Sequence, residues 1–105
     1  MRSKAIVAGV GMTSFGRHLE TGLKALGAGA VQAAVGDAGI SLGDLQAAYV
    51  GNAAAGLVTG QECIRGQVIL RSIGLGKLPV VNVENACASG STALLQACVM
   101  VSTGI

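Results

Sequence analysis

A short apolar strand that turns directly into a charge-free helix constrains this chain more than any other feature. The run Val80–Val83 is rich in β-branched residues, which is typical of a buried strand. From Asn85 to the C-terminus no residue carries a charge. A helix with one solvated side normally shows charged residues there, so we expect the helix over 88–101 to be buried nearly all round. Cys87 stands at the turn between the strand and the helix.

Two further strand–helix units precede this corner. We expect strands over 4–10, 47–51 and 80–84, and helices over 21–38, 61–73 and 88–101. The alternation of strands and helices, with the loop lengths between them, predicts an α/β fold with a parallel sheet and right-handed crossovers.

Local signals predict where the first helix ends and how the second one faces. Gly39 is a natural end for the first helix, and Ser41 with Asp44 suits the cap of a short turn. In the second helix the spacing predicts Ile64, Val68, Leu70 and Ile73 inward and Arg65 and Arg71 outward.

The composition indicates that this chain packs against more protein. Its 105 residues fit one domain, but only 11% are charged and 51% are hydrophobic, where about 25% charged is usual. So little charge cannot cover the surface of a small protein. We expect the partner to be a missing C-terminal part, a second subunit or both, and the end after a helix looks like a truncation.

Several classes of function are disfavoured by composition. A net charge of +2 and two aromatic residues do not make a nucleic-acid surface. The pair Gly9 and Gly11 follows a predicted strand, but Ser14 stands where a dinucleotide fingerprint needs its third glycine. The apolar run 5–10 is too short for a signal peptide. Polar residues interrupt the charge-free tail, so we expect no membrane span.

The cysteine count favours reduced thiols. Three cysteines lack a C-x-x-C pair and only one histidine is present, so we expect neither a disulfide framework nor a metal site. This use of cysteine, with no signal peptide, favours a cytoplasmic protein. We interpret Cys63 and Cys98 as inert packing, since free cysteine is among the most buried residue types.

The position of Cys87 leaves two interpretations open, packing and chemistry. A cysteine between a strand and a helix meets unpaired N–H groups and the positive end of the helix dipole, which favour the thiolate. The same N–H groups can hold the oxyanion of a tetrahedral intermediate. Ala88, Ser89 and Gly90 are small and leave room for a substrate.

Residues 81–94, VNVENACASGSTAL, resemble the nucleophile motif of thiolases, particularly the branch associated with sterol carrier protein. The opening VAGVGMTSFG at 7–16, with AGI at 38–40 and YVGN at 49–52, also resembles that branch. The similarity spans essentially all 105 residues. It implies a thiolase-like fold of two similar halves in five α-β-α-β-α layers. Residues 1–105 would be the opening β-α-β-α-β-α portion of the N-terminal domain, without the C-terminal half.

The resemblance also implies an activity. Cys87 would accept an acyl group from acyl-CoA, with its own backbone N–H in the oxyanion hole. The acyl group would then pass to CoA, cleaving a 3-ketoacyl-CoA, or to the acetyl-CoA carbanion in a Claisen condensation. The CoA thioester is a substrate, so no separate cofactor is implied, and a homodimer or homotetramer is expected.

The family's activating histidine and second cysteine belong to C-terminal motifs, which His18 and Cys98 do not match. We therefore expect residues 1–105 alone not to turn over. The alternatives are a carbon–carbon lyase or lipid-transfer partner of the same fold, and a short non-catalytic subunit. A peroxisomal address at a later C-terminus would not be visible here.

Overall fold

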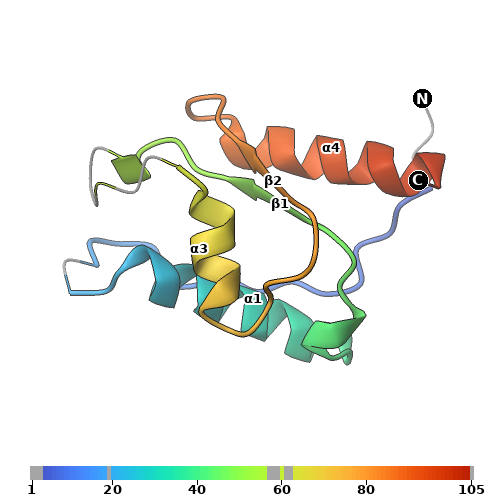
Figure 1. The fold of residues 1–105 in the computed structure, drawn as a ribbon, viewed down its shortest axis with the longest axis horizontal. Helices are drawn as coiled ribbons and strands as arrows, with labels where there is room; N and C mark the ends of the chain where they lie inside the picture. The colour runs from blue at the N-terminus through green and yellow to red at the C-terminus, as the bar shows by residue number, and fades with distance from the viewer. Residues whose placement is uncertain (1–3, 19, 57–59, 61–62, 105) are drawn as a thin grey trace.

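A small parallel sheet lies between two helical layers (Figure 1). The computed structural model describes residues 4–18, 20–56, 60 and 63–104. Strand β1 (Ala48–Gly51) pairs in parallel with β2 (Val80–Val83). Helix α4 (Ser89–Thr103) covers one face of the sheet and α3 (Arg65–Arg71) the other, where α1 (Leu23–Ala38) packs on α3. The predicted α/β class with parallel pairing is confirmed.

The strand register decides which residues face which helix. Val50 is paired with Asn82, and Gly51 with Val83. Because side chains alternate along a strand, the two pairs face opposite sides of the sheet. Val50 and Asn82 lie against Gly66 of α3, whereas Gly51 lies against the first turn of α4. The sheet therefore meets both helices through glycines.

The prediction of a strand over 4–10 is wrong. This segment forms no ladder and crosses from the end of α4 to α1 (Figure 1). The Lys4 N–H donates to the Ser102 hydroxyl, and the Val10 N–H donates to the Asp37 carboxylate at 2.9 Å. A Cβ at Gly9 would lie 2.5 Å from the carbonyl oxygen of Ala34. The backbone of the apolar run thus packs on α1 at its glycine. The side chains of Ser102 and Asp37 accept N–H groups that a neighbouring strand would otherwise pair.

The ends of α1 and of the turn after it follow the sequence signals. Gly39 takes the left-handed conformation, with φ 70° and ψ 27°, directly after α1. Ser41 and Asp44 form a capping box on the short 3-10 helix η1 (Leu42–Asp44). Both predictions are confirmed.

Helix α3 is shorter than predicted, and two of its facing residues were assigned wrongly. It begins at Arg65 after Ile64, which has φ 46° and is 58% exposed rather than inward. Arg65 is half-buried rather than outward, because its guanidinium is hydrogen-bonded to Asn52. Leu70 is buried and Arg71 exposed, as predicted. Positions 61 and 62 of the predicted helix lie outside the described residues.

Helix α4 is covered on one side only within this chain. Ser89 and Ala93 are its buried residues, whereas Leu94, Leu95 and Val101 are each about 60% exposed. The predicted burial all round is therefore not met by these residues alone, because a two-stranded sheet supplies a single covering layer. Burial of the outer face against more protein stays a prediction.

One stretch of the described residues, Ala86–Thr103, is long and apolar enough to cross a bilayer by length and composition. A core helix of a soluble protein passes the same test, so this finding is weak evidence for a membrane span.

Candidate active site at the Cys87 corner

The turn between β2 and α4 holds the candidate nucleophile. β2 ends at Val83 and α4 begins at Ser89, so Cys87 lies in the five-residue connection 84–88. Its side chain is exposed. The connection follows the carboxyl end of a parallel strand, which is where ligands bind in open α/β sheets. Cys87 therefore stands where a substrate can reach its sulfur.

A buried hydroxyl ties this turn to the helix. The Ser89 side chain is 5% exposed; its oxygen accepts the Asn85 N–H at 2.8 Å and its O–H donates to the Ala86 carbonyl at 2.8 Å. The Ala88 N–H donates to the Asn85 carbonyl at 2.9 Å, and the Asn85 amide donates to the Thr92 hydroxyl at 3.0 Å. These bonds hold the turn on both sides of Cys87.

The residue before Cys87 has an unusual backbone. Ala86 has φ 46°, in the left-handed region, which costs an L-residue about 1–2 kcal/mol. Its N–H donates to the Glu84 carboxylate at 2.6 Å. Such outliers persist where surrounding contacts hold them, and they concentrate at functional sites.

The end of β1 lies directly beneath the first turn of α4. A Cβ added to Gly51 would lie 2.5 Å from the carbonyl oxygen of Ser89 and 2.8 Å from the nitrogen of Gly90. Real Cβ atoms essentially never come within 3.0 Å. The close backbone contact at Gly51 thus fixes how near the first turn of α4 lies to β1, and with it the position of Cys87.

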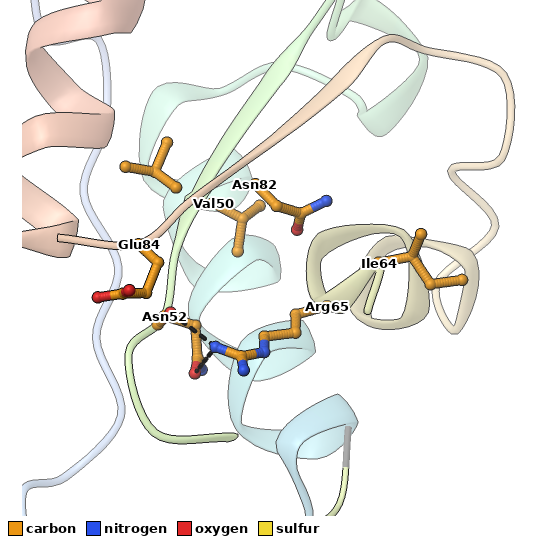
Figure 2. Close-up of a pocket in the computed structure, with 7 residues that line it drawn as sticks. Val50, Asn52, Ile64, Arg65, Asn82 and Glu84 are labelled. Atoms are coloured by element: carbon orange, nitrogen blue, oxygen red, sulfur yellow. Dashed lines mark hydrogen bonds between the residues drawn. The ribbon is translucent and has the colours of Figure 1, made fainter. Parts of the chain in front are cut away.

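A small cavity of about 150 Å³ opens beside the corner, at the carboxyl ends of both strands (Figure 2). Arg65 is fixed in it, because its guanidinium donates to the backbone oxygen of Asn52 at 2.8 Å and to the amide oxygen of Asn52 at 3.3 Å. The lining residues are Val50, Asn52, Ile64, Arg65, Asn82, Val83 and Glu84.

Sequence reasoning did not select Asn52, Arg65 or Glu84. A signal was present for two of them, since Asn52 directly follows β1 and Glu84 directly follows β2. Polar residues that follow neighbouring parallel strands meet at one edge of the sheet. Arg65 carried no such signal.

The other candidate residues lie elsewhere. His18 is in the loop before α1, and its ring nitrogen is hydrogen-bonded to the Ser14 carbonyl. Cys98 is half-buried within α4. Cys63 is exposed, so its interpretation as a buried packing residue is wrong. Cys87 and Cys98 are free thiols.

Comparison with known proteins assigns a family. Residues 5–105 match the N-terminal domain of thiolase. The chain is 45% identical over 104 residues to an acetyl-CoA acetyltransferase of Methanocaldococcus jannaschii, an alignment that covers 99% of this chain and 26% of that protein.

Two further relatives come from other groups of organisms. Benzoylsuccinyl-CoA thiolase subunit BbsB of Thauera aromatica is 41% identical over 90% of this chain and 23% of its own length. Sterol carrier protein 2 of Gallus gallus is 36% identical over 100% of this chain and 19% of its own. The chain spans about a fifth to a quarter of the length of these relatives. By the match over residues 5–105, this chain belongs to the thiolase family.

Proposed function

We propose that this chain carries the nucleophile of a thiolase-type acyltransferase, and that Cys87 accepts the acyl group of an acyl-CoA. The observation that carries the proposal is the exposed thiol in the turn between β2 and α4. The family membership and the 45% identity to an acetyl-CoA acetyltransferase support the same chemistry.

In the proposed first step the Cys87 thiolate attacks the thioester carbonyl carbon of acyl-CoA. A sulfur–carbon bond forms to Cys87, the bond between the acyl carbon and the CoA sulfur breaks, and CoA leaves as its thiolate. The step involves no oxidation or reduction. The N–H groups of Asn85, Ala86 and Ala88 are already bonded within the turn. The donor proposed for the developing oxyanion is therefore the backbone N–H of Cys87 itself.

The second step passes the acyl group to CoA or to the acetyl-CoA carbanion. Either route needs a group that moves a proton at the acceptor. His18, the single histidine of the chain, is in another loop. We therefore place the acid–base partner outside residues 1–105, and we expect these residues alone not to turn over. A homodimer or homotetramer is proposed on the family likeness.

The test is covalent labelling of the intact protein with isotopically labelled acetyl-CoA, followed by peptide mapping by mass spectrometry. We expect one acetyl group on Cys87 and none after Cys87→Ala. The matched controls are Cys63→Ala and Cys98→Ala, which each remove one of the other two cysteine side chains and should leave the label on Cys87.

A folded protein that acquires no acetyl group on Cys87 would contradict the proposal. That result would favour a carbon–carbon lyase or a non-catalytic member of the same fold. Acetylation of Cys63 or Cys98 in place of Cys87 would also contradict it, because the corner would then not supply the nucleophile.

A further inference from the structure

We propose that Glu84 is a positioning residue for the nucleophile, acting through the backbone of Ala86. The inference rests on the proposed function of Cys87 and adds a residue to which no role in that function was assigned. Glu84 directly follows β2, and its carboxylate accepts the Ala86 N–H at 2.6 Å. Ala86 in turn precedes Cys87, so the hydrogen bond acts one residue from the reacting sulfur.

The hydrogen bond matters because of the conformation that it stabilises. Ala86 has φ 46°, and an alanine prefers the right-handed and extended regions to this one. A peptide that relaxed to one of those regions would rotate the following residue and redirect the Cys87 side chain. A charged acceptor strengthens a hydrogen bond to a backbone N–H, so the Glu84 carboxylate biases the turn toward the observed geometry.

The arrangement of charge around Glu84 supports this assignment. Figure 2 shows its carboxylate turned away from the guanidinium of Arg65, although both residues line the same cavity. Arg65 is hydrogen-bonded to Asn52, and helix α4 carries no charged residue. Among the hydrogen bonds of the described residues, the Glu84 carboxylate thus acts on the turn through the bond that it accepts from the Ala86 N–H.

The preferred conformation of the peptide sets the expected size of the effect. Without the hydrogen bond, the cost of the left-handed conformation at Ala86 lowers the fraction of molecules with the observed turn by about tenfold. We expect Glu84→Ala to slow acetylation of Cys87 by acetyl-CoA about tenfold. Glu84→Gln keeps an acceptor oxygen at the same length and should restore the rate to within about threefold of the wild type.

A second substitution tests the mechanism rather than the residue. Glycine occupies positive φ about as readily as negative φ, so Ala86→Gly removes most of the conformational cost. In that background Glu84→Ala should slow acetylation only about twofold. Glu20→Ala is the matched control, since Glu20 is an exposed acid in the loop before α1, and it should leave the rate unchanged.

The rates are measured in the intact protein by quenched labelling and mass spectrometry of the Cys87 peptide, with circular dichroism to confirm folding. Equal rates for Glu84→Ala and wild type would overturn the inference, as would a tenfold loss that persists in the Ala86→Gly background. Alkylation of Cys87 by iodoacetamide is recorded in parallel, and the same ordering of variants is expected. If acetyl-CoA fails to label the wild type, the proposed function fails, while the alkylation series still tests Glu84.

Discussion

Replacing Gly51 by alanine should push the nucleophile out of place. The new Cβ would lie 2.5 Å from the carbonyl oxygen of Ser89, whereas ordinary contacts begin at 3.4 Å. The first turn of α4 must therefore retreat by about 0.9 Å, and the neighbours are backbone atoms that cannot turn aside. Such overpacking costs up to about 3 kcal/mol, offset by roughly 0.5–1 kcal/mol because alanine loses less chain entropy. We expect a net loss of about 2 kcal/mol.

Urea unfolding followed by circular dichroism measures this loss. With a slope of about 1 kcal/mol per molar urea, the midpoint should fall by about 2 M. Acetylation of Cys87 should also slow at least tenfold, since misplacing a reacting group by about an ångström can cost about a hundredfold in rate. The control is Gly36→Ala in α1, where an added Cβ meets nothing within 4 Å, and it should gain close to 1 kcal/mol. A Gly51→Ala protein as stable as the wild type would refute the reasoning.

Two further predictions concern the turn after α1 and the start of α3. The Ser41 N–H and hydroxyl donate to the Asp44 carboxylate and hold the pKa of Asp44 below its usual value. Because this pKa is lower in the folded than in the unfolded protein, the carboxylate stabilises the fold fully above the unfolded pKa of about 3.9. That stabilisation is lost as the pH falls through the folded pKa. Urea midpoints recorded from about pH 6 to about pH 3 should drop less for Asp44→Asn than for the wild type, and parallel curves would contradict this. The N–H of buried Gly66 donates to the side-chain oxygen of Asn82 at 2.6 Å. Asn82→Ala removes this acceptor and should lower the free energy of unfolding, measured in urea, by about 2 kcal/mol. Asn82→Asp keeps an acceptor oxygen and should lower it by less than half as much.

Most helices and strands could be predicted because their signals are local. The apolar spacing of α1 and the left-handed Gly39 after it depend on residues close together in the chain. The β-branched run of β2 and the charge-free run of α4 are equally local. The prediction of a strand over 4–10 was wrong because a short apolar run looks the same in the sequence whether it pairs with a strand or packs on a helix. The carboxylate of Asp37, 27 residues beyond Val10, takes the N–H that a ladder would have paired.

At the candidate site the sequence alone was enough to select Cys87 and to place it between a strand and a helix. It could not reveal the left-handed Ala86 or the carboxylate that accepts its N–H, because backbone angles at a turn depend on how the two flanking elements meet. Nor could it bring Asn52 and Arg65 to the same cavity. The motif at residues 81–94 determined which residue is the candidate nucleophile, and the packing of β1 and β2 against α3 and α4 decided what surrounds it. The physical reason is that a turn's geometry is set by contacts between segments far apart in the chain.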